Sequence, residues 1–181
     1  MHVEIQDILH FWFEECSPRQ WFVKDPEFDA QIRTRFGGLL DQAKAGNYED
    51  WTSNLKGCLA LIIVLDHFSR NVYRDTATAF SSDDMALSIT MTCLERGYVQ
   101  HDNPRWRHFM LIPMMHSEDI EIQNASLPLF QIHTNVEVYQ YAVRHRDIIA
   151  RFGRYPHRNS ILGRTSTEEE HLFLQQPGSR F

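Results

Sequence analysis

The chain has 181 residues, enough for one domain with a full hydrophobic core, and its hydrophobic fraction of 43% argues against disorder. Its formal net charge of −6 excludes general attraction to nucleic acid or anionic lipid, and three widely spaced cysteines give no disulfide framework or zinc-binding pair. The N-terminus lacks the basic region of a signal peptide, and no apolar run is long enough to span a bilayer. We therefore expect residues 1–181 to form a single cytoplasmic domain without a membrane partner.

The first half of the chain carries apolar residues at helical spacing, separated by residues that start or stop helices. The pair Asp25-Pro26 is a typical helix start, and Gly97 is a typical C-terminal stop. The most apolar segment is rich in leucine and alanine, which favours a buried helix over a strand. Helices are therefore predicted over residues 5–13, 28–40, 55–68 and 81–97.

Prolines and capping residues divide the next part of the chain. Pro104 is expected to start a short helix that ends at Pro113. Ser117 is expected to cap the following helix, because two acidic residues come directly after it and suit the helix dipole. Pro128 should kink or shorten that second helix.

A long amphipathic helix is predicted over residues 135–152, with Gly153 as its stop. No segment shows the alternating, valine- and threonine-rich pattern of a strand, so the predicted fold class is all-α. The last helix starts at STEEE, which contains two overlapping capping boxes, Ser166 with Glu169 and Thr167 with Glu170.

Positive charge is concentrated between Arg144 and Arg164, where six arginines accompany a single acid, Asp147. This segment carries +5, whereas the twelve basic and twenty-three acidic residues of the remaining chain give −11. Arginine outnumbers lysine fifteen to three, and guanidinium groups suit two-point contact with carboxylate or phosphate. The segment is therefore either an anion site or an internal salt-bridge network that fastens the C-terminal elements to the acidic body.

On the helix over residues 135–152, His145 belongs to an apolar stripe and should face the core or the floor of a cleft. Arg144, Asp147 and Arg151 share a neighbouring stripe, on which Asp147 can pair with both arginines. The apolar stripe consists of Val138, Tyr141, His145, Ile148, Ile149 and Phe152.

Two further polar patches follow apolar segments. The sequence LDHFSRNVYR places Asp66, Arg70 and Arg74 at the end of the most apolar helix, where cations also suit the helix dipole. His116 directly precedes a helix N-terminus, which can bind an anion unless the next serine already caps it. We expect a shared concave region that contains Arg151, Arg154, His157 and Arg158 together with Asp66 or Arg70.

Several motifs along the whole chain carry a resemblance to one bacterial family: FWF, WFVKDPEFDAQI, LALIIVLDHFSRNVYR, HSED, HRDIIARFGRYPHRN and ILGRTSTEEEHLFL. Together they resemble domain of unknown function 924. The resemblance implies a single-domain, right-handed α-α superhelix of the tetratricopeptide-like kind, and it implies no function. The chain departs from the usual family pattern at His67 and Ser69, where relatives read LDQFPRN, and at Asp75.

The motifs of common enzyme classes are missing from the sequence. Without HExxH, a cysteine pair, a P-loop or GxSxG, we expect no metal and no cofactor. An acid–base role for His145 is open, although Asp147 is a poor partner because residues two apart do not face each other on a helix. Nucleic acid is not expected as a partner, because the −11 charge of the remaining chain opposes a long phosphate track.

The leading hypothesis is a site for a small anionic molecule, a carboxylate or a phosphate. The alternatives are a tetratricopeptide-like module that binds acidic peptide segments and a hydrolase-type enzyme that uses the same cluster. A closed pocket around His145 would favour the ligand or the enzyme, and an open groove lined by Arg74, Arg151 and Arg158 would favour the peptide. Candidate catalytic residues are His145 and His157, and candidate ligand-binding residues are Arg70, Arg74, Arg151, Arg154, His157, Arg158, Asn159 and Arg164.

Overall fold

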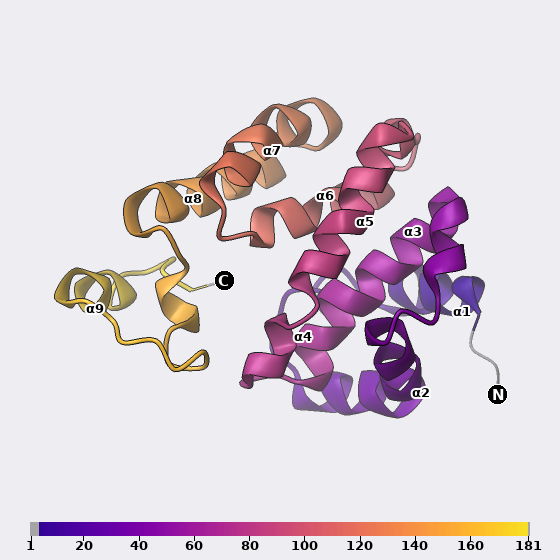
Figure 1. The fold of residues 1–181 in the computed structure, drawn as a ribbon, viewed down its shortest axis with the longest axis horizontal. Helices are drawn as coiled ribbons and strands as arrows, with labels where there is room; N and C mark the ends of the chain where they lie inside the picture. Colours follow the sequence, from indigo (N-terminus) through magenta and orange to yellow (C-terminus); the bar gives the residue numbers. More distant parts are fainter. Residues whose placement is uncertain (1–3, 181) are drawn as a thin grey trace.

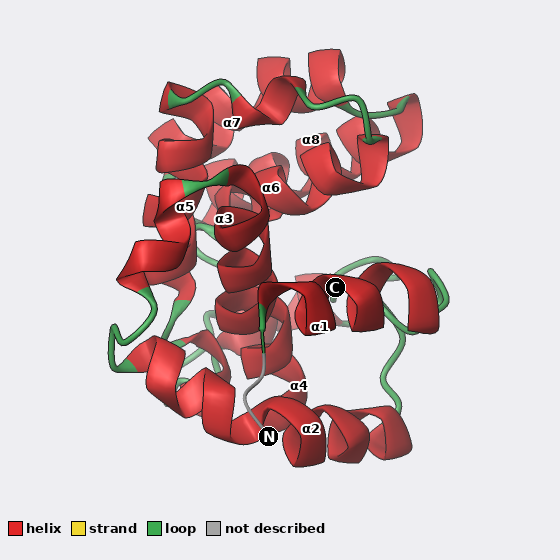
Figure 2. Ribbon diagram, turned by 90° about the vertical axis from the view of Figure 1, so that its right-hand side faces the viewer, coloured by secondary structure: helices red, strands yellow, loops and turns green. Residues whose placement is uncertain are grey.

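Helices account for the regular structure of residues 4–180, the part of the chain that the computed structural model describes (Figure 1). No strand occurs among these residues, which confirms the predicted all-α class (Figure 2). No helix in residues 4–180 has both the length and the apolar character needed to cross a membrane. The helices are α1 (Ile5–His10), α2 (Pro26–Lys44), α3 (Leu55–Ile62), α4 (Ser69–Val72), α5 (Asp83–Glu95), α6 (Pro104–His116), α7 (Ile120–His133), α8 (Val136–Phe152) and α9 (Glu168–Leu174).

Apolar side chains of α1 to α6 form the main core, and a smaller cluster joins α8 to the segment after it. Figure 1 shows α1–α5 on one side of the molecule and α7–α9 on the other, with α6 between them. Apolar residues of the predicted helices are buried in these clusters, among them Trp12, Phe36, Leu61, Ile62, Leu65 and Ile149.

Several predicted helix ends are confirmed. The side chain of Asp25 accepts hydrogen bonds from the first backbone N–H groups of α2. Gly153 ends α8 with a φ of 68°, in the left-handed region that favours glycine. At the start of α9, the predicted capping box between Thr167 and Glu170 is present.

Other helix ends differ from the prediction. Pro113 lies inside α6, so it does not end that helix as predicted, and Pro128 lies inside α7, where a kink was expected. A proline interrupts the helical hydrogen-bond pattern, but the buried apolar side chains of these helices hold the chain in place. The cap of α7 is Asp119, which accepts from the N–H of Glu121, and Ser117 instead ends α6.

A widened π-helical turn, Ile63–Phe68, connects α3 to α4. All six of its residues are buried, including the polar residues Asp66 and His67. Such turns carry one residue more than an α-helical turn and frequently occur at functional sites. The turn sets two ionisable side chains at the end of the most apolar helix, next to α6.

Candidate functional site

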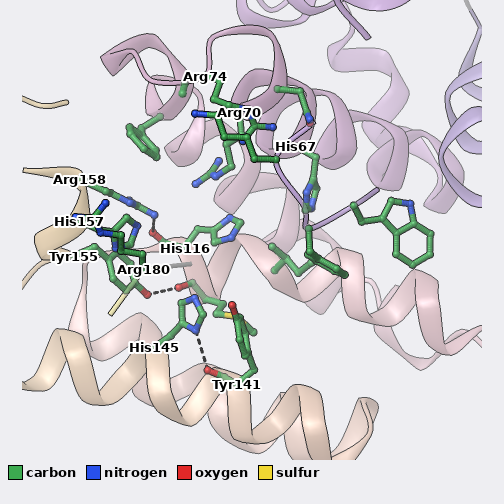
Figure 3. Close-up of a pocket in the computed structure, with 18 of the residues that line it drawn as sticks. His67, Arg70, Arg74, His116, Tyr141, His145, Tyr155, His157, Arg158 and Arg180 are labelled. Atoms are coloured by element: carbon green, nitrogen blue, oxygen red, sulfur yellow. Dashed lines mark hydrogen bonds between the residues drawn. The ribbon is translucent and has the colours of Figure 1, made fainter. Parts of the chain in front are cut away.

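A cavity of about 1020 Å³ lies between the α3–α4 region, α6, α8 and the segment after Gly153. Figure 3 shows side chains from all of these elements pointing into the same space. Apolar side chains from the loop before α2, from α6 and from α8 make up part of the lining. Basic residues of the lining are Lys24, Arg70, Arg74, Arg144, Arg158 and Arg180, and its histidines are His67, His108, His116, His145 and His157.

Asp66 is the buried acid of this region, with no exposed surface. Its Oδ1 accepts from Nη1 of Arg70 at 3.1 Å and lies 2.8 Å from Nδ1 of His116, while Nε2 of His67 lies 3.3 Å from Oδ2. Burial raises the pKa of the Asp66 carboxyl, but the Arg70 charge and the neighbouring histidines outweigh this effect and hold the pKa well below its ordinary value. Asp66 is therefore ionised at neutral pH.

Arg70 uses its guanidinium to join two acids. Besides Asp66, it binds both carboxylate oxygens of Asp83 at 2.8 and 2.9 Å. Asp83 is the first residue of α5, where a negative charge also suits the helix dipole. The donors of Arg70 are thus largely occupied by two carboxylates of the same chain.

Arg158 lies beside Arg70 and Asp83, and fewer of its hydrogen-bond donors have acceptors than those of Arg70. It is 7% exposed, and its guanidinium lies between the rings of Phe80 and Tyr155, at 4.7 and 4.6 Å from the centroids. Nη2 donates to the backbone oxygen of His116 at 3.0 Å, whereas Nη1 is 3.7 Å from Asp83, beyond hydrogen-bond length. Nε of Arg158 has no hydrogen-bond acceptor within residues 4–180. A buried cation therefore keeps donors for a further acceptor.

The histidines that line the cavity are neutral at pH 7. Burial is the main cause: it lowers the pKa of His145 and His67 to about 3 and that of His157 and His108 to about 4, and it also lowers the pKa of His116. Nδ1 of His145 lies 2.8 Å from the backbone oxygen of Tyr141, so this nitrogen carries the proton (Figure 3). Neutral imidazoles offer hydrogen bonds but no charge, so the arginines and Lys24 provide the positive charge of the cavity.

Three arginines of the basic segment lie outside the cavity and form ion pairs with acids that precede or begin other helices. We call this group the clasp. Its pairs are Arg151–Glu169 at 2.7 Å, Arg154–Glu170 at 2.7 Å and Arg164–Glu118 at 2.6 Å. Asn159 belongs to the clasp as well, because its amide contacts Glu170 and its oxygen accepts from Arg164. The structure thus places Arg151 and Arg154 away from the concave region in which they were expected, and keeps His157 and Arg158 in it.

Two pairings, one on α8 and one in the segment after α4, also differ from simple expectation. Asp147 pairs with Arg146 at 2.9 Å and not with Arg144 or Arg151 as predicted, because Arg144 instead stacks on the ring of Tyr141. Tyr141 itself is 39% exposed, so the apolar stripe of α8 is interrupted at the mouth of the cavity. Arg74 lines the cavity, as expected for a ligand-binding candidate, but Asp29 binds it through two hydrogen bonds of 2.5 and 2.7 Å.

Sequence reasoning singled out His116 and Asp66 but did not connect them. Fifty residues separate the two, and only the packing of α6 against the α3 region brings them together. The signal that the sequence did contain was two short polar motifs, LDH and HSED, each next to a strongly apolar segment. Asp83 lies beside the cavity arginines Arg70 and Arg158, and Glu118 pairs with Arg164 of the clasp. Nothing in the sequence pattern indicated these pairings.

The comparisons with known proteins extend over almost the whole chain. A solved structure from Agrobacterium tumefaciens, described as protein of unknown function ATU0120, is 36% identical, with a TM-score of 0.89 over 94% of this chain and 96% of that chain. None of the curated proteins matches the sequence. The family model described as "Bacterial protein of unknown function (DUF924)" matches residues 8–178, and the chain therefore belongs to the DUF924 family.

Proposed function

We propose that the protein binds a small anionic molecule, a carboxylate or a phosphate, in the cavity, with Arg158 as the main charged contact. The observation that carries this proposal is the state of Arg158, which is buried on the cavity wall with donors unused. Asp83, its nearest acid, already binds Arg70 through both oxygens. A buried charge without a full set of partners is costly, and an anionic ligand would supply the missing acceptors.

The lining of the cavity supports a ligand that is partly apolar. Aromatic and aliphatic side chains such as Trp21, Phe80 and Met115 line the same space as the arginines. Burying apolar surface of a ligand against them contributes about 25 cal/mol per Å². The proposed ligand therefore has an anionic group for Arg158 and an apolar part for these side chains.

A tetratricopeptide-like superhelix that binds acidic peptide segments is the alternative proposal. It requires an open groove lined by Arg74, Arg151 and Arg158, but Arg151 lies outside the cavity and Arg74 is held by Asp29. His145, in contrast, is buried and lines the cavity, as the small-ligand hypothesis requires. These placements favour a small ligand, and acidic peptides belong in the same assay as competitors.

The experiment is a thermal melt against phosphate, monocarboxylates, dicarboxylates and an acidic peptide, each compared with chloride at matched ionic strength. A ligand at a hundredfold excess over its dissociation constant should stabilise the fold by about 2.7 kcal/mol. Arg158→Gln should abolish this response. Arg151→Gln is the matched control, because it removes an exposed clasp arginine of the same segment, and it should respond like the unmutated protein. Equal responses of the two variants, or no anion-specific shift at all, would contradict the proposal.

A further inference from the structure

His116 and Asp66 form a pair that the binding of an anion by Arg158 does not use. Nδ1 of His116 lies 2.8 Å from Oδ1 of the fully buried Asp66. An ionised carboxylate can only accept a hydrogen bond, so Nδ1 carries the proton and Nε2 keeps its lone pair. Figure 3 shows the ring of His116 between Arg158 and His67, within the cavity.

The charge state of this pair suits a proton acceptor. Burial, followed by the charge of Arg70, lowers the pKa of His116, so the ring is neutral at pH 7. A neutral imidazole whose other nitrogen is held by a carboxylate is the usual form of a histidine that takes up a proton during a reaction. The same arrangement also ties α6 to the α3 region, so the test must separate a chemical role from a structural one.

The pair lies directly beside the proposed anion contact. Nη2 of Arg158 donates to the backbone oxygen of His116 at 3.0 Å. A molecule whose anionic group binds Arg158 therefore places its neighbouring atoms near the His116 ring, and such positioning is itself a large part of catalysis. Among the described residues that line the cavity there is no cysteine, and Ser160, the one serine, is exposed. Water is thus the nucleophile at hand for a base at this position.

We infer that His116 is the general base for hydrolysis of a carboxylic ester that also carries an anionic group, an inference that rests on the proposed anion site at Arg158. Nε2 takes a proton from water while the water oxygen bonds to the ester carbon. The bond from that carbon to the alcohol oxygen then breaks, and the departing alkoxide takes the proton back from His116. Water, the one co-reactant, is divided between the acid and the alcohol.

Asp66 acts in this scheme as a positioning residue. It fixes the Nδ1–H tautomer of His116 and stabilises the imidazolium that forms when Nε2 is protonated. An ester suits a site with one base, because an alcohol leaves with less proton assistance than the amine of an amide.

The test compares two chromogenic esters of similar length, the anionic mono-4-nitrophenyl succinate and the neutral 4-nitrophenyl butyrate. The unmutated protein should hydrolyse the anionic ester with the higher kcat/KM. In His116→Asn, the amide can still donate to Asp66 but offers no basic lone pair, so turnover should fall by about 10²–10⁴-fold. Its melting temperature and its response to anions should remain. His171→Asn, on the exposed face of α9, is the matched control and should keep full activity.

Asp66→Asn tests the positioning role through kcat counted per folded molecule, with the folded fraction measured by circular dichroism. It should lower this kcat for the anionic ester and leave KM nearly unchanged, whereas a merely structural role would leave kcat per folded molecule at the value of the unmutated protein. His116→Gln replaces His116→Asn if the latter does not fold.

Two results would overturn the inference and leave the anion site in place. One is full activity in folded His116→Asn, and the other is no turnover of either ester by a protein whose melt still responds to anions. Different results would show that the anion site itself is absent. In that case no anion changes the melting temperature, and Arg158→Gln hydrolyses both esters as the unmutated protein does. That result would overturn the ester specificity that the inference assigns to Arg158.

Discussion

The arginines of the basic segment, residues 144–164, have different surroundings in the clasp and in the cavity. Each clasp arginine, Arg151, Arg154 or Arg164, has a carboxylate of its own within 2.7 Å. On the cavity side, Arg158 shares Asp83 with Arg70 and lies 3.7 Å from it. The clasp arginines and Arg158 all come from this one segment, so the local sequence does not tell them apart. Whether an arginine has a carboxylate of its own, and not how many arginines lie together, therefore distinguishes a structural ion pair from a candidate binding site.

The two groups also differ in what they contribute to stability. Glu170 in the clasp is 2% exposed and accepts from Arg154, Asn159 and the backbone N–H of Thr167, so it joins α9 to the segment after α8. Removing one partner of such a set leaves the others buried and unpaired. Arg158 is more buried than the clasp arginines, yet no carboxylate binds it at hydrogen-bond distance, so its net contribution to stability should be small.

Lowering the pH should weaken the cavity region first and the clasp later, and this is the largest effect we predict. The pKa values of His145 and His157 in the folded protein are about 3 and 4, below the unfolded value near 6.5. The unfolded chain therefore binds more protons below pH 6.5, and stability falls as the pH drops from there toward 4, by about 1.4 kcal/mol per pH unit for each histidine. His67 and His108 act in the same direction.

The clasp should respond in a lower pH window. The bond to Arg154 lowers the pKa of Glu170 to about 2, below its ordinary value of 4.5, so its contribution is present above 4.5 and is lost as the pH falls toward 2. Denaturant unfolding measured across the acid range should show both windows, and Glu170→Gln should flatten only the lower one. A loss of stability that begins only below pH 4.5 would contradict the neutral state of the cavity histidines.

Breaking the clasp directly should have the next largest effect. Glu170→Ala should lower the free energy of unfolding by about 3–5 kcal/mol, because it leaves a partly buried guanidinium and an amide without their acceptor. Glu169→Ala is the matched control on the same helix: its pair with Arg151 is exposed and should contribute less than about 1 kcal/mol. Equal losses in the two variants, measured by denaturant unfolding, would show that the clasp has no buried centre.

The smallest predicted change in the free energy of unfolding is that of Arg158→Met, which we compare with Arg154→Met in the clasp. Arg158→Met keeps most of the volume between Phe80 and Tyr155, so without ligand it should change the free energy of unfolding by less than about 1 kcal/mol. Arg154→Met should lower it by more than Arg158→Met does, since the buried Glu170 loses its cation. A larger loss for Arg158→Met than for Arg154→Met would place Arg158 in an internal salt-bridge network and remove the reason for an anion site.

Much of the fold could be predicted from local signals in the sequence. Asp25 and Gly153 mark helix ends because capping by an aspartate and a left-handed glycine depend on the residue itself and its nearest neighbours. The predicted helix end at Pro113 is wrong, because tertiary packing decides whether a helix continues through a proline, and packing is not a local property. The widened turn that displays Asp66 is equally invisible in a helical pattern.

The candidate site could be predicted only in part. The sequence indicated that Arg158, His145 and His157 belong together, and all three line the cavity. It could not show which arginines have acids as partners, because those acids come from distant segments: Glu118 is 46 residues from Arg164, and Asp83 is 75 residues from Arg158. The Asp66–His116 pair was hidden for the same reason, since its two residues meet only through the packing of separate helices.

The central claim is that an anion binds beside Arg158 in the cavity and not at the clasp. A crystal structure of the protein soaked with tungstate, a phosphate analogue with strong anomalous scattering, tests this claim most directly. We predict an anomalous peak within hydrogen-bond distance of the Arg158 guanidinium, lost in Arg158→Gln and kept in Arg151→Gln. A cavity without a peak, or a peak that appears only beside Arg151, Arg154 or Arg164, would contradict it.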